Sequence, residues 1–139
     1  MKYRPHKYQQ YAKDFILDHP VCCLMLDMGL GKTVITLSAL WELALDRFDI
    51  GKILVIAPKR VATDTWTKEL QKWEHLTGLT ASLVVGSQKQ REDALVRPSF
   101  LYIINRENVS WLVQNYRWDF DTVVIDEPVS YTHLTLPTN

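Results

Sequence analysis

The chain has 139 residues, of which 47% are hydrophobic and 23% charged, a balance typical of one globular domain with a single core. Sixteen basic residues offset sixteen acidic ones, which excludes an overall basic surface, so any nucleic-acid contact must be local. The apolar runs are far shorter than a membrane span, and the N-terminus lacks the apolar segment of a secretory signal. We therefore expect a cytoplasmic protein that makes no membrane contact.

The first third of the chain predicts a helix, a strand, a turn and a second helix. Pro5–Leu17 has apolar residues at helical spacing, and the apolar run Val21–Leu26 predicts a buried strand. Cys22 and Cys23 are adjacent in this run, so their side chains would point to opposite faces of a sheet. We expect them to be core residues in a reducing compartment. The second helix runs to about Arg47.

The remainder of the chain predicts strands that alternate with helices. Further strands are expected at Lys52–Ala57, Ala81–Val85, Phe100–Ile104 and Thr122–Ile125. Helices are expected at 64–75 and 109–116, and a capping box of Ser87 and Gln90 predicts the start of another short helix. Apolar strands separated by amphipathic helices predict an α/β fold, with a mostly parallel sheet of about five strands and helices on both faces.

The turn after the first strand has the pattern of a phosphate-binding loop. It ends in Gly-Lys-Thr and departs from the strict pattern only at Leu26, where a glycine is usual. Its backbone N–H groups and the following helix N-terminus would bind the phosphates of a nucleotide, Lys32 would reach the outer phosphates, and the Thr33 hydroxyl would help to hold Mg²⁺. The nucleotide-binding residues predicted here are Met28, Gly29, Leu30, Gly31, Lys32 and Thr33.

Two carboxylates follow the last predicted strand, and ligands of parallel sheets bind at the carboxyl ends of the strands. Asp126 would hold the Mg²⁺ that bridges the phosphates, and Glu127 would orient or deprotonate the attacking water. The alternative is a solvated acidic strand end. Lys32 and Glu127 are thus the catalytic candidates, and Thr33 and Asp126 the metal ligands.

These two motifs resemble motifs I and II of superfamily-two helicases and translocases. Met28–Thr33 is especially similar to the Swi/Snf-type DNA-dependent ATPases, including their phage and bacterial relatives. The resemblance implies that residues 1–127 form an N-terminal RecA-like lobe of a prokaryotic or phage-encoded protein. It also implies that this protein uses ATP and Mg²⁺ to move on DNA, and the similarity to this family favours duplex DNA.

Three further segments extend the resemblance. Gln9 matches the glutamine that contacts the adenine edge, the alternative being an exposed helical residue. Lys59 and Arg60 lie in a segment similar to motif Ia and would contact the DNA backbone, or be ordinary solvated charges. Trp66 and Trp73, with Glu69, match the helix that follows, and their spacing favours a place in the core over base stacking.

The end of the chain departs from the family. We expect residues 128–139 to be non-native and the gene to have been cut short after motif II, the alternative being a divergent natural tail. The second RecA-like lobe with its arginine fingers would then be missing, and the isolated chain inactive. Another phosphate-loop protein, such as a kinase, and a non-catalytic binding module remain as alternatives. A kinase has no reason to carry the Tyr8-Gln9 helix or Pro58–Arg60.

Overall fold

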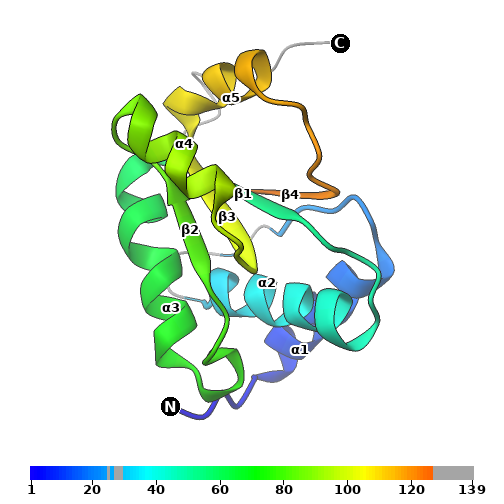
Figure 1. Ribbon diagram of the computed structural model, residues 1–139. Helices are drawn as coiled ribbons and strands as arrows, with labels where there is room; N and C mark the ends of the chain where they lie inside the picture. Colours follow the sequence, from blue (N-terminus) through cyan, green and yellow to red (C-terminus); the bar gives the residue numbers. More distant parts are fainter. Residues whose placement is uncertain (25, 27–29, 127–139) are drawn as a thin grey trace.

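The computed structural model describes residues 1–24, 26 and 30–126. Its α-helices and strands are labelled in Figure 1. The helices are α1 (Lys7–Asp18), α2 (Lys32–Trp41), α3 (Trp66–Lys72), α4 (Gln88–Val96) and α5 (Val109–Asn115), and the strands are β1 (Ile53–Ala57), β2 (Ala81–Val84), β3 (Leu101–Asn105) and β4 (Thr122–Ile125). A π-helical turn (Glu42–Asp46) extends α2, another (Val61–Thr65) precedes α3, and 3-10 turns lie at Glu74–Leu76 and Arg106–Asn108.

The four strands form one parallel sheet in the order β2-β3-β1-β4. The register aligns the strands at their starts, because Ile53 of β1 pairs with Leu101 of β3 on one side and with Thr122 of β4 on the other. All four strands therefore end at the same edge of the sheet, where a doubly covered parallel sheet binds its ligands. The predicted α/β class and parallel sheet are confirmed.

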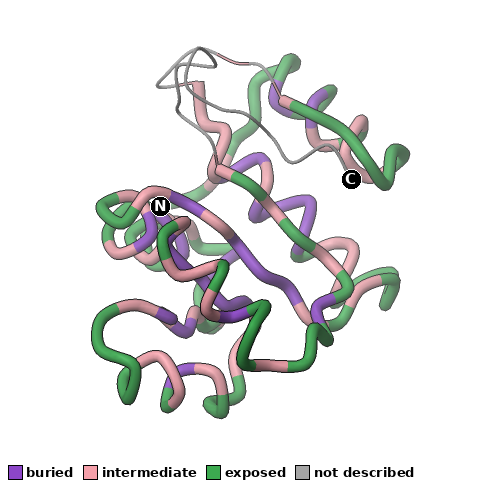
Figure 2. Tube along the Cα trace, turned by 90° about the horizontal axis from the view of Figure 1, so that it is seen from above, coloured by how far each residue is buried: buried purple, intermediate pink, exposed green. Residues whose placement is uncertain are grey.

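Alternating side chains of the central strand build two separate cores. Ile53 and Val55 of β1 pack with α2 and α3 on one face of the sheet, whereas Leu54 packs with α4 and α5 on the other. Figure 1 shows these two pairs of helices on opposite sides of the strands. Figure 2 shows the buried residues concentrated along the central strands and the helices that cover them. Helices on both faces, as predicted, are confirmed.

The predicted strand at Val21–Leu26 is wrong for the residues that the structure describes. Residues 21–24 and 26 are in no strand, Val21 is 94% exposed, and Cys22 and Cys23 are exposed instead of lying in the core. A parallel strand needs a neighbour to pair its backbone groups. Within the described part of the chain, β4 pairs with β1 alone, so the sheet has four strands and the apolar run has no partner.

The local signals in the rest of the chain were reliable. Ser87 and Gln90 form the predicted capping box at the start of α4: Gln90 N–H donates to Ser87 Oγ, and Ser87 N–H donates to Gln90 Oε1. The other predicted helices and strands agree with the structure to within a few residues. No helix in the described ranges is long and apolar enough to span a bilayer.

Candidate functional site

The turn into α2 depends on a glycine. Gly31 is the N-cap of α2 and has φ of +81°, a left-handed conformation that side chains disfavour. A Cβ built on Gly31 would lie 2.6 Å from Gln9 Nε2, so the Gln9 side chain would have to shift away from Leu30 to admit it. Lys32 and Thr33 follow in the first helical turn and are half-buried. No acidic residue lies in that turn, and Gly31 offers no side chain to cap it, so its N–H groups suit an anion.

Helix α1 holds this turn through one carbonyl group. Tyr8 Oη donates a hydrogen bond to the Leu30 carbonyl at 2.9 Å, and Gln9 Nε2 donates to the same oxygen at 3.2 Å. The Gln9 Oε1 in turn accepts from the backbone N–H of His6 at 2.9 Å, which closes a capping box at the start of α1. Gln9 is only 7% exposed, so it is not the solvated helical residue that was the alternative.

Asp126 directly follows β4, and two contacts fix it. Its backbone N–H donates to the Ile56 carbonyl at 2.8 Å, which extends the β1–β4 pairing by one residue. Its side-chain Oδ2 accepts a hydrogen bond from Trp66 Nε1 at 2.9 Å. Trp66 is 2% exposed and belongs to the core under α3, as its spacing predicted. The predicted metal ligand is therefore attached to the sheet and to α3 at once.

The ends of β1 and β3 carry the other polar groups of this edge. Lys59 and Arg60 follow β1 and are exposed. The buried Asn105 ends β3 and donates to Glu107 Oε2 at 2.8 Å, next to the basic side chains. Hydrogen bonds from its own backbone N–H and from Asn105, with the positive charges of Arg106 and Lys59, hold the pKa of Glu107 below its usual range. The edge thus combines cations with a carboxylate that stays ionised.

The structure brings only some of the predicted residues together. Gln9 contacts Leu30 and lies against Gly31, whereas no hydrogen bond in the described part of the chain joins Asp126 to Lys32 or Thr33. Met28, Gly29 and Glu127 lie outside the described residues. The prediction missed Trp66 as a partner of Asp126. A buried indole N–H needs an acceptor, and that requirement was the available signal.

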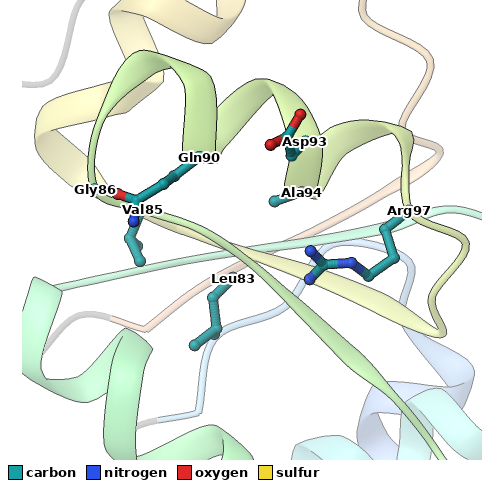
Figure 3. Close-up of a pocket in the computed structure, with 7 residues that line it drawn as sticks. All are labelled: Leu83, Val85, Gly86, Gln90, Asp93, Ala94 and Arg97. Carbon is teal, nitrogen blue, oxygen red and sulfur yellow. The ribbon is translucent and has the colours of Figure 1, made fainter.

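A separate cavity of about 330 Å³ lies between β2 and α4, away from these residues. Figure 3 shows its lining, which consists of Leu83, Val85, Gly86, Gln90, Asp93, Ala94 and Arg97. None of these is a predicted site residue, so the cavity is not part of the candidate nucleotide site.

Comparison with known proteins gives a family match over most of the chain. A family profile described as the SNF2-related domain matches residues 7–133. Protein p41 of Acyrthosiphon pisum secondary endosymbiont phage 1 is 36% identical over 128 residues, which cover 90% of this chain and 28% of the phage protein. The bifunctional helicase and thymine dioxygenase JBP2 of Trypanosoma cruzi is 31% identical over 119 residues, 73% of this chain and 11% of JBP2. The chain thus spans less than a third of either relative's length.

The fold has a counterpart among solved structures. The Sulfolobus solfataricus SWI2/SNF2 ATPase core in complex with dsDNA matches with a TM-score of 0.73 at 22% identity, over 91% of this chain and 26% of that one. At that identity the likeness concerns the fold alone. It confirms the expected RecA-like α/β lobe.

Proposed function

Since the chain belongs to the SNF2-related family, we propose that it is the ATP-binding lobe of a DNA-dependent ATPase that couples ATP hydrolysis to movement on DNA. The main observation behind the proposal is that two features occur together on one parallel α/β fold. A left-handed Gly31 turns the chain into α2, with Lys32 and Thr33 in its first turn, and Asp126 follows the carboxyl end of β4.

Lys32 and the first turn of α2 would bind the phosphates of ATP. The turn offers backbone N–H groups and the positive end of the helix dipole, and its half-buried lysine adds a full positive charge. Glu127 would orient or deprotonate the attacking water beside them.

The donor atoms suit Mg²⁺, which prefers hard oxygen ligands and takes only one or two from the protein when phosphates supply others. The Thr33 hydroxyl and the Asp126 carboxylate would be those two ligands. One Asp126 oxygen accepts the Trp66 hydrogen bond, and the other oxygen is left for the ion. When bound, Mg²⁺ neutralises charge on the outer phosphates.

Gln9 would contact the adenine edge through the amide donor and acceptor sites that its bonds to Leu30 and His6 do not use. A primary amide has two N–H donors and an oxygen with two lone pairs. One donor is engaged by the Leu30 carbonyl and one lone pair by the His6 N–H. The remaining donor and lone pair match the donor–acceptor pattern of an adenine edge.

Lys59 and Arg60 would contact the DNA backbone, and their exposure at the end of β1 supports this role. By the same family resemblance, arginines of a second RecA-like lobe would stabilise the transition state, and such arginines contribute several orders of magnitude in rate. We therefore expect these 139 residues alone to hydrolyse ATP negligibly. A vigorous DNA-stimulated ATPase rate of the purified chain would contradict this expectation.

Binding of ATP and of duplex DNA by Lys32→Ala tests the proposal. We expect ATP affinity in the presence of Mg²⁺ to fall at least about tenfold, because a charged phosphate contact is lost, while DNA affinity is unchanged. Lys89→Ala is the matched control, since Lys89 is a lysine of α4 that pairs with Asp93 of the same helix. Equal ATP affinity for Lys32→Ala and Lys89→Ala would reject the nucleotide site.

A further inference from the structure

The indole of Trp66 has a single hydrogen-bonding group, and the fold directs it to one acceptor. The side chain is 2% exposed, so its N–H is shielded from water, and it donates to Asp126 Oδ2 at 2.9 Å. A buried indole N–H without a partner costs about 1–3 kcal/mol, so the core that encloses Trp66 also requires the Asp126 carboxylate to stay in place.

Two different elements meet in this contact. Trp66 opens α3 directly after the π-helical turn Val61–Thr65, and Asp126 is 60 residues further along the chain, at the end of β4. The hydrogen bond therefore joins the start of α3 to the residue after β4.

The hydrogen bond from Trp66 restricts the rotation of the Asp126 side chain. The bond from its N–H to the Ile56 carbonyl fixes the main chain, but the carboxylate could still rotate about its side-chain bonds. Because the indole holds Oδ2, the direction of Oδ1 is defined as well. A carboxylate whose second oxygen is held in one orientation is preorganised to bind an ion.

We propose that Trp66 is a positioning residue, whose indole N–H orients the Asp126 carboxylate toward the divalent ion that arrives with the nucleotide. The inference rests on the proposed function, because Asp126 is there the metal ligand. Groups of this kind, which hold a metal ligand in place, typically change metal affinity by about ten- to a hundredfold when removed.

The end of α3 carries a control contact of the same chemistry. Trp73, the residue directly after α3, donates its Nε1–H to Glu69 Oε2 of that helix. The two residues are only four apart in the sequence, and neither is a candidate ligand. Removal of the Trp73 N–H should therefore leave metal binding unchanged, although it removes an indole–carboxylate hydrogen bond just as the change at Trp66 does.

Paramagnetic broadening by Mn²⁺–ATP tests where the ion binds. The chain has five tryptophans, whose indole N–H signals can each be followed in solution. If Asp126 is the ligand, the Trp66 signal should broaden at the lowest Mn²⁺–ATP concentration, before the other four signals, because its indole N–H bonds directly to the ligand carboxylate. Asp126→Asn should abolish the selective broadening. Broadening of all five signals alike would overturn the inference.

Replacement of Trp66 with benzothienylalanine tests the role of the N–H, because sulfur takes the place of the N–H with little change in shape. We expect the affinity for Mn²⁺–ATP to fall about tenfold, and the affinity for metal-free ATP to stay the same. Restoring the N–H with 5-fluorotryptophan at residue 66 should restore binding, and benzothienylalanine at residue 73 should have no effect. A merely structural role would lower both affinities together.

The outcomes separate the inference from the function beneath it. If Mn²⁺–ATP binding depends on Lys32 but is equally tight with tryptophan and with benzothienylalanine at residue 66, the positioning role is wrong and the proposed function stands. If Mn²⁺–ATP binding does not depend on Lys32 or Asp126, the proposed function fails and the inference fails with it.

Discussion

Asp126 and the Gly31–Thr33 turn, the two halves of the candidate nucleotide site, are held in different ways. Asp126 extends the β1–β4 pairing and bonds to a tryptophan in the core, so it depends on the sheet and on the packing of the whole domain. The turn depends on α1, which holds it through the Leu30 carbonyl, and the segment before it is in no strand where the structure describes it. Substitutions in the sheet should therefore affect the entire fold, and those around α1 should affect mainly the turn.

The largest effect should come from the sheet. Leu54 is fully buried in the central strand β1, so Leu54→Ala should lower the free energy of unfolding by about 2–5 kcal/mol through lost contacts and a cavity. Urea denaturation measures the change. Val21→Ala is the control in the segment before the turn, where 94% exposure predicts a change within about 0.5 kcal/mol. Equal losses for the two variants would contradict the comparison.

Gly31→Ala should have the next largest effect. The left-handed backbone costs about 1–2 kcal/mol for a residue with a side chain, and the new methyl group would also meet Gln9. Unfolding experiments and ATP binding would both register the change. Gly78→Ala is the matched control, because Gly78 has φ of +92° and nothing within 4 Å of the added Cβ. A Gly31 variant that loses no more stability than the Gly78 variant would show that the contact with Gln9 is unimportant.

Gln9→Ala should loosen the turn without disturbing the sheet. The variant loses the bond to Leu30 and the capping bond to His6, with an expected cost of about 1 kcal/mol in the free energy of unfolding. Amide hydrogen exchange should rise in residues 30–35 and not in β1 or β3. Gln10→Ala serves as the comparison, since the Gln10 side chain bonds to the exposed Asp14 within α1 and not to the turn in the described part of the chain. Uniformly faster exchange across the sheet would contradict the expected confinement.

Mild acidification should produce the smallest effect, at the contact between α2 and the 3-10 turn Glu74–Leu76. His75 Nε2 bonds to Ser38 of α2 at 2.7 Å, and burial, followed by the charge of Lys13, lowers the pKa of His75 below 6.5. The folded chain then binds fewer protons than the unfolded chain, so stability falls as the pH drops from about 6.5 toward the lowered pKa. Urea unfolding between pH 7 and 5 measures this, and His75→Gln should reduce the slope. An unchanged slope would exclude His75 as its source.

The helices, the strands β1 to β4 and the helices on both faces of the sheet were predictable from the spacing of apolar residues. The capping box of Ser87 and Gln90 is a local pattern, and it formed as expected. The run from Val21 failed because an apolar strand forms only where another strand pairs with it, and composition does not supply that partner. The family resemblance of the chain was confirmed by the match over residues 7–133.

The candidate site was predictable in its parts but not in its connections. The position of Asp126 after a strand followed from the apolar run before it, and the resemblance pointed to Gln9. The bond between Trp66 and Asp126 joins residues 60 apart, so no local pattern could reveal it. The shared Leu30 carbonyl is likewise a result of how α1 packs on α2.

The exposure of Cys22 and Cys23 has a practical consequence for labelling. These are the only two thiols in the chain, and both are exposed on the segment that leads toward Gly31. The slight burial of the otherwise exposed Cys22 thiol, followed by the neighbouring Cys23, raises the pKa of Cys22, so less of its reactive thiolate is present at neutral pH than for an ordinary cysteine. Because both thiols are exposed, a maleimide dye can be attached to the segment before the Gly31–Thr33 turn without introducing any new cysteine. Its fluorescence would report nucleotide arrival from the side of the site that is held by α1.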